Sequence, residues 1–135
     1  MVRKIPGLPI EWENFVFCLI LHLTLPLVPL ALEQWFSGHI EAKSATLTAA
    51  MYSMAIGRSS RSVALFGLGV LQGLAFSAAF GFLSTQNELA HADSFSYSAI
   101  LLIMIFHSIE RYNRHVIDQA PFLEFVLRKN SLTQD

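Results

Sequence analysis

The sequence predicts an all-α, small polytopic membrane protein: four transmembrane helices in a bundle, followed by a short cytoplasmic amphipathic tail. Hydrophobic residues make up 53% of the 135 residues and charged residues only 14%, whereas a soluble domain carries about 25% charge. Four stretches are apolar and free of formal charge. Basic residues gather at alternate ends of these stretches, which is the distribution that the positive-inside rule describes.

The first transmembrane helix is expected at about residues 14–35. Its apolar run is long enough to cross a hydrocarbon core at about 1.5 Å of rise per residue. Trp12 and Trp35 flank the run, as aromatic anchors at the two membrane interfaces do. Pro26 and Pro29 lie inside it and predict a kink in its outer half, because proline removes a helical hydrogen bond.

The other three helices are expected at about residues 40–57, 62–84 and 94–110. The stretch 62–84 is the clearest, since it contains 23 consecutive residues without a charge. The stretch 40–57 is the weakest, because Glu41 and Lys43 leave a short charge-free core. A core of that length also suits a re-entrant segment. The placement of charged residues therefore has to distinguish a full span from a re-entrant segment.

Charge placement favours four spans with both termini in the cytoplasm. If residues 40–57 did not cross, the arginines that follow them would lie outside and the positive-inside bias would invert. We therefore expect a multi-pass protein of the bacterial inner membrane, a source suggested by compactness and by the lack of an N-glycosylation motif. Every basic residue except Lys43 then lies inside: Arg3, Lys4, Arg58, Arg61, Arg111, Arg114, Arg128 and Lys129.

Small residues recur every four positions in the second and third spans. Such stripes let two helix backbones approach closely within a membrane. They predict either a hairpin of spans two and three inside one subunit or an interface of a homo-oligomer. The stripes consist of Ala45, Ala49, Ser53 and Gly57 in one span, and of Gly69, Gly73, Ser77 and Gly81 in the other.

His22, Gln72 and His107 are polar side chains within spans, where such residues are functional candidates. The antiparallel order of the first and fourth spans puts His22 and His107 at similar depth. Two histidines so placed suit axial haem ligation or a proton relay. The alternative is a pair of hydrogen-bonded histidines that only stabilise the bundle. We expect no cofactor, and keep haem at His22 and His107 as the alternative.

The chain divides into a bundle at 1–110 and an amphipathic tail at 111–135. Polar residues from His107 to Asp118 recur at helical spacing and form one stripe, which predicts a surface for a cytosolic partner or lipid headgroups. The alternative is a solvated face with internal ion pairs. The predicted binding residues are Glu110, Arg111, Arg114, His115, Asp118, Arg128 and Lys129.

No catalytic residue is predicted, because the chain has no nucleophile signature and no phosphate-loop or metal motif. We expect no metal site, and a net charge of −1 gives no reason to expect a nucleic-acid partner. The expected function is a non-enzymatic membrane subunit that self-associates in the lipid bilayer and anchors or signals to a cytosolic partner through its basic tail. The alternatives are a homo-oligomeric channel or membrane-permeabilising effector, and a haem-binding redox subunit.

Overall fold

The computed structural model describes residue 7 and residues 9–85 and 88–119, and within these ranges it contains helices and no strands. The predicted all-helical class is therefore confirmed. In chain order the elements are α1 (Ile10–Leu19), the π-helix η1 (Ile20–Thr24), the 3-10 helix η2 (Leu25–Leu27), α2 (Val28–Ser37), α3 (Ala42–Ser59), α4 (Val63–Ser84), α5 (Ala92–Tyr112) and the π-helix η3 (Asn113–Ile117).

Three of these helical stretches are long and apolar enough to cross a membrane. They are Ile10–Ser37, Val63–Ser84 and Ala92–Ile117. Their outward surfaces carry large apolar side chains such as Phe17, Leu71 and Leu101, which is the surface that a lipid environment requires. The last stretch runs beyond the expected end at residue 110, so the first part of the predicted tail, Arg111 to Ile117, continues the helix.

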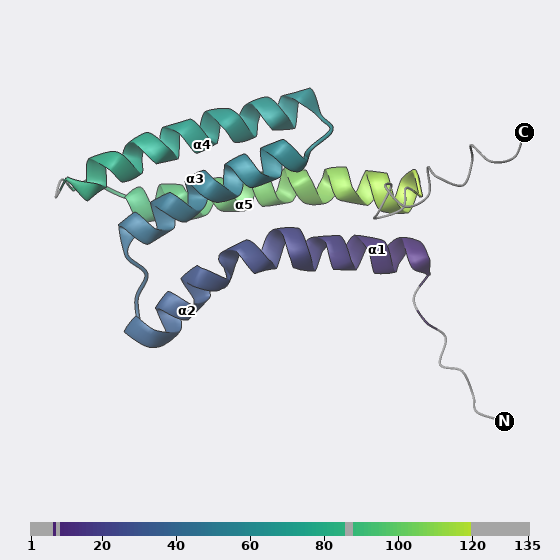
Figure 1. Ribbon diagram of the computed structural model, residues 1–135, viewed down its shortest axis with the longest axis horizontal. Coiled ribbons are helices and arrows are strands. Elements are labelled where there is room, and N and C mark those ends of the chain that lie inside the picture. Colours follow the sequence, from purple (N-terminus) through teal and green to yellow (C-terminus); the bar gives the residue numbers. More distant parts are fainter. Residues whose placement is uncertain (1–6, 8, 86–87, 120–135) are drawn as a thin grey trace, which may run out of the picture.

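α3 lies at the centre of the structure, along α4 on one side and along α5 on the other (Figure 1). Much of its surface is covered, with Ala49, Tyr52 and Ile56 packed in the core beside Ile100 and Ile103 of α5. A helix covered by its neighbours needs small side chains for close approach rather than large apolar ones for lipid. This explains why α3 is less apolar than the three stretches above.

The first long helix is interrupted where the sequence predicts a kink. Proline has no N–H and its ring clashes with the carbonyl four residues earlier. Pro26 and Pro29 therefore disturb regular α-helical bonding at the carbonyls of His22 and Leu25. The chain responds with the π-turn η1 and the 3-10 turn η2, and α2 bends away from the line of α1 (Figure 1).

The contact between α3 and α4 is made backbone to backbone at glycines. A Cβ atom on Gly69 would lie 2.6 Å from the Ser53 carbonyl oxygen and 2.7 Å from the Gly57 Cα. Gly73 lies equally close to the Met54 side chain. Ala45 and Ala49 are also buried. These members of the two small-residue stripes therefore pack within one subunit.

The outer part of the α4 stripe has a different environment. Ser77 and Gly81 are exposed, and a Cβ atom on Gly81 would meet nothing within 4 Å. The four-residue spacing is thus continuous in the sequence but not in its packing. Phe76 and Leu83 of α4 still pack inward beyond Gly73. Ser77 and Gly81 lie off that face, because each four-residue step turns about 40° further around a helix of 3.6 residues per turn.

Candidate functional site

A polar cluster joins the turn between α3 and α4 to the last turns of α5. We call it the polar clasp, and define it as Ser59, Ser60, Arg61 and Ser62 of the turn together with His107, Glu110 and Arg111 of α5. The three α5 residues are spaced i, i+3 and i+4 and so share one helix face. That face points into the protein, at the end of the molecule where α1 begins and η3 ends (Figure 1).

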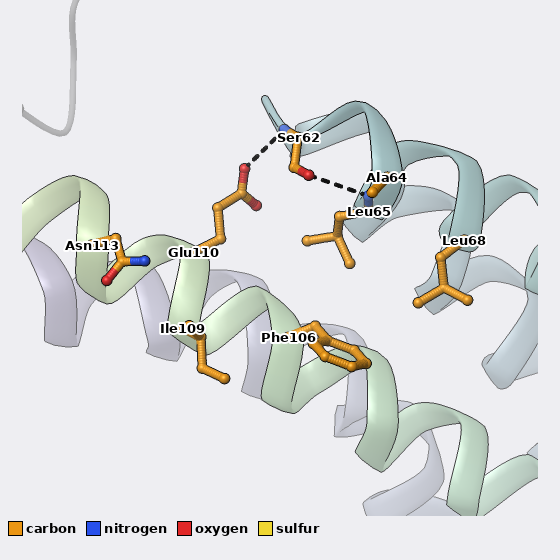
Figure 2. Close-up of a pocket in the computed structure, with 8 residues that line it drawn as sticks. All are labelled: Ser62, Ala64, Leu65, Leu68, Phe106, Ile109, Glu110 and Asn113. Carbon is orange, nitrogen blue, oxygen red and sulfur yellow. Dashed lines mark hydrogen bonds between the residues drawn. The ribbon is translucent and has the colours of Figure 1, made fainter.

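Glu110 holds the turn that precedes α4. One carboxylate oxygen, Oε1, accepts hydrogen bonds from Ser60 Oγ (2.8 Å), Arg61 N (2.8 Å) and Ser62 N (3.3 Å). Figure 2 shows the bond to Ser62 beside the cap that Ser62 makes to Leu65. Backbone N–H groups at a helix start have no helical acceptors, and a negative charge there is favourable. Glu110 therefore acts as a cap contributed by another helix.

Arg111 binds the end of α3. Its Nη2 donates to the Ser59 carbonyl oxygen (2.8 Å), and its Nε donates to His107 Nε2 (3.2 Å). Only 6% of the residue is exposed. A cation is favourable near the last carbonyls of a helix, which carry partial negative charge. Glu110 and Arg111 thus hold the start of α4 and the end of α3, respectively.

The bond from Arg111 determines the protonation state of His107 in this arrangement. A guanidinium group only donates hydrogen bonds, so Nε2 of His107 must present its lone pair. The ring is then neutral and carries its proton on Nδ1. Nδ1 lies 3.6 Å from Glu110 Oε2, which is too long for a hydrogen bond. Both atoms are buried without a hydrogen-bond partner in the described part of the chain.

The first helix reaches the clasp through a second histidine. The rings of His22 and His107 lie 6.0 Å apart between centroids, at an angle of 46°. His22 Nδ1 lies 3.2 Å from the Cys18 carbonyl oxygen and 3.6 Å from Cys18 Sγ. The sequence therefore predicted correctly that His22 and His107 lie at similar depth.

Aromatic side chains add a second contact between α1 and α5, closer to the ends of the chain. Trp12 and Phe15 of α1 both pack edge to face on Tyr112 of α5, with ring centroids 6.1 and 5.7 Å apart. Such pairs contribute about 0.5–1.5 kcal/mol beyond their buried area. Trp12 therefore packs at the α1–α5 contact against Tyr112, the residue that follows Arg111, while 41% of Trp12 stays exposed.

Gln72, the third polar residue predicted within the spans, lies apart from the clasp. Its Oε1 accepts from Ser53 Oγ of α3 (3.3 Å), and its Nε2 donates to the Ala99 carbonyl of α5 (3.2 Å). Thr46 and Ser96 share a further buried bond of 3.1 Å. These side chains connect α3 to α4 and α5. Their hydrogen-bonding groups are used between helices.

Two of the residues predicted to form a binding surface at the start of the tail are buried in the structure. Arg111 is buried against the α3–α4 turn, and His115 is only 1% exposed. Helical spacing placed these residues on one face, but spacing alone does not give the direction of that face. Asp118 is exposed and Arg114 is half-buried. Arg128 and Lys129 lie outside the described residues.

Three serines of the clasp were missed by sequence reasoning. Ser59, Ser60 and Ser62 follow one another closely at the end of the second predicted span. Serine is common at helix caps because its hydroxyl bonds to the free backbone groups there. The local signal was therefore present, but the carboxylate that completes the cap comes from a residue about fifty positions later.

A groove of about 410 Å³ opens beside the clasp, between the start of α4 and the end of α5 (Figure 2). Leu65, Leu68, Phe106 and Ile109 form its apolar walls. Glu110 lies at its polar end, with Ser62 and Asn113. Because Glu110 Oε2 is buried on the His107 side, that oxygen does not face a ligand in the groove.

Neither haem nor a metal ion gains support from the geometry. Iron ligation by His107 would need a free ring nitrogen lone pair, but Nε2 is bound by Arg111 and Nδ1 carries the proton. Across the described ranges, no group of three or more His, Cys, Asp and Glu residues is arranged to hold a metal ion. The chain also matches no protein-family model, no curated protein and no solved structure.

The hydrogen-bond network makes a direct prediction about His107. Ring-¹⁵N NMR of the protein in lipid nanodiscs at about pH 8 is expected to show a neutral His107 protonated at Nδ1. The Arg111→Gln variant removes the guanidinium donor, and the Nε2-protonated form should then appear. A wild-type His107 protonated at Nε2 would contradict the assigned bond.

Proposed function

We propose that this chain is a non-enzymatic, four-span membrane subunit that anchors a cytosolic partner. Both termini lie in the cytoplasm, and the segment after Gln119 carries the partner site. The observation that supports this most is the position of the clasp. The start of α1, the α3–α4 turn and the end of η3 lie at one end of the molecule (Figure 1). The clasp joins α5 to the α3–α4 turn at this end, which is where the last described residues lie.

The proposal that α3 is the fourth span follows from its surroundings. Its 18 residues extend about 27 Å at 1.5 Å per residue, close to the thickness of a hydrocarbon core. Lys43 and Arg58 lie near its two ends, where long side chains reach the interface. α3 runs beside two helices of membrane-spanning length, and a helix between two spans occupies the same depth.

The proposed orientation follows from the cations. Arg58, Arg61, Arg111 and Arg114 lie at the clasp end, whereas Lys43 lies at the opposite end. Excess arginine and lysine marks the cytoplasmic side of a bacterial inner-membrane protein. The clasp is thus proposed to lie at the cytoplasmic interface.

Only part of the two small-residue stripes remains available for self-association, namely the exposed Ser77 and Gly81 of α4. Gly57, Gly69 and Gly73 are used in the contact between α3 and α4, so the same surface cannot also bind a second copy. The proposal therefore rests on the tail and does not include a homo-oligomer. The tail itself, with Arg128 and Lys129, lies outside the described residues.

A channel is the weaker alternative, because polar side chains in the core form hydrogen bonds between helices and do not line a path for ions. Ser53, Gln72, Thr46 and Ser96 all bond across helices. Purified protein in liposomes is therefore expected to give no ion flux above that of empty liposomes at any applied potential. Flux that Gln72→Leu abolishes would favour the channel instead.

Removal of residues 120–135 tests the anchor proposal. Native mass spectrometry of the full chain, extracted gently from its own membrane, is expected to show an additional polypeptide. The shortened chain should insert equally well and lose that polypeptide. The matched control is Arg128→Gln with Lys129→Gln, which keeps the length and removes the charge. Equal recovery with the shortened chain, or a pure homo-oligomer from the full chain, would contradict the proposal.

A further inference from the structure

We propose that the polar clasp is a proton-operated latch, in which protonation of His107 at Nε2 exchanges its Arg111 partner for Glu110 and loosens α1 from α5. The inference is independent of any partner at the tail. It rests on three contacts around one ring: the bond from Arg111, the open approach of Glu110, and the facing ring of His22.

The first contact makes the closed latch dependent on a neutral ring. Arg111 Nε donates to His107 Nε2 at 3.2 Å, and that bond exists only while Nε2 has a free lone pair. A proton added to Nε2 places two N–H donors, both on cationic groups, face to face. The Arg111–His107 bond then has to break.

The second contact becomes stronger when the ring is protonated, because the Nδ1–H that already faces Glu110 then belongs to a cation. Glu110 Oε2 lies 3.6 Å from His107 Nδ1, and neither atom has a hydrogen-bond partner among the described residues. Closing this gap by less than 1 Å would give a charge-assisted hydrogen bond of about 2.7–2.9 Å. Glu110 can turn Oε2 toward His107 while Oε1 remains with the α3–α4 turn, so the turn stays held.

The third contact explains why α1 responds. The His22 ring on η1 lies 6.0 Å from the His107 ring, and Arg111 is buried beside them. A second positive charge at this position repels Arg111 and any proton on His22. The first helix is attached to α5 by the aromatic contact of Trp12 and Phe15 with Tyr112, so that contact reports the movement.

Other charged or titratable groups near the His107 ring also contribute to its electrostatic environment. Glu110 and Arg111 lie on its own helix, and Cys18 and His22 on the first helix. Tyr52 of α3 lies in the core with Ile103, one turn from His107. Arg114 and His115 of η3 lie about two turns further along the same helical stretch.

Trp12 fluorescence tests the latch in the full chain. The chain contains two tryptophans, and Trp35 is 84% exposed, so Trp35→Phe leaves Trp12 as the single reporter. In nanodiscs acidified from about pH 8 to about pH 3, a range that extends well below the ordinary titration of histidine, the Trp12 emission is expected to shift to the red in one reversible step. Ring-¹⁵N NMR of the same sample should show His107 gaining its Nε2 proton at the same midpoint.

The matched control is His107→Gln in the same background. A glutamine oxygen still accepts from Arg111 but does not titrate, so the step should disappear. Glu11 and Glu13 flank Trp12 in both proteins, so any effect they have on its emission is the same in both. A step that persists in His107→Gln would overturn the latch, and so would a wild-type His107 that gains its proton without a change in Trp12 emission. A His107 that stays neutral throughout the range would overturn it as well, whether or not the variant folds.

Discussion

Replacing Gly69 by alanine is expected to destabilise the protein by about 1–3 kcal/mol, the usual cost of adding a methyl group to a closely packed contact. The new Cβ would lie 2.6 Å from the Ser53 carbonyl and 2.7 Å from the Gly57 Cα. Both are backbone atoms, so no side chain can rotate to make room. α3 and α4 must therefore move apart, and the bond between Ser53 and Gln72 next to the contact weakens with them.

Gly67→Ala is the matched control for this prediction. Gly67 lies on the same helix two residues earlier, is exposed, and has nothing within 4 Å of its added Cβ. There the substitution removes only glycine's poor helix propensity, a gain of up to about 1 kcal/mol. Reversible unfolding in mixed micelles, followed by circular dichroism, should give opposite signs for the two variants. Equal effects would show that the α3–α4 contact is not as close as described.

Glu110→Ala is expected to cost about 2–3 kcal/mol, in the range for hydrogen bonds to a charged group. One oxygen of Glu110 accepts three bonds from the α3–α4 turn. Without it, Arg61 N loses the acceptor that Glu110 provides at the start of α4, whereas Ser62 N keeps its bond to Ser60 Oγ (3.0 Å). The side chain is 20% exposed, so water replaces part of the lost hydrogen bonding and limits the decrease in unfolding free energy.

Glu110→Gln separates the acceptor from the charge. Its amide oxygen keeps the geometry of Oε1, so the loss in unfolding free energy should be at most half that of the alanine variant. Hydrogen exchange of the Arg61 amide, which donates to Glu110 Oε1, gives a local readout, with protection lost in Glu110→Ala and largely kept in Glu110→Gln. Unchanged protection in Glu110→Ala would contradict the capping role.

The sequence was most informative where a single residue type determines the local structure. Pro26 and Pro29 placed the interruption of the first helix because proline cannot donate a backbone hydrogen bond. The four-residue glycine spacing identified a close helix contact. Ser77 and Gly81 nevertheless lie outside that contact, because each four-residue step turns about 40° further around a helix of 3.6 residues per turn.

The clasp could be predicted only in part. The depths of His22 and His107 followed from the antiparallel order of their helices, and the rings do face each other. The inward direction of Arg111 did not follow, since a cation near a helix end usually points to water. Its direction is set by the Ser59 carbonyl, which a contact with the α3–α4 turn brings within reach. Such long-range partners leave no periodic signal.

Cysteine accessibility tests directly whether α3 crosses the membrane. In a Cys18→Ala background, Arg61→Cys and Glu88→Cys each place one thiol in a connection between helices. A membrane-impermeant maleimide added to intact cells is expected to label position 88 and to reach position 61 only after permeabilisation. If α3 does not cross, the two positions exchange sides of the membrane. Position 61 would then be labelled on intact cells and position 88 would be protected, and the four-span arrangement would be wrong.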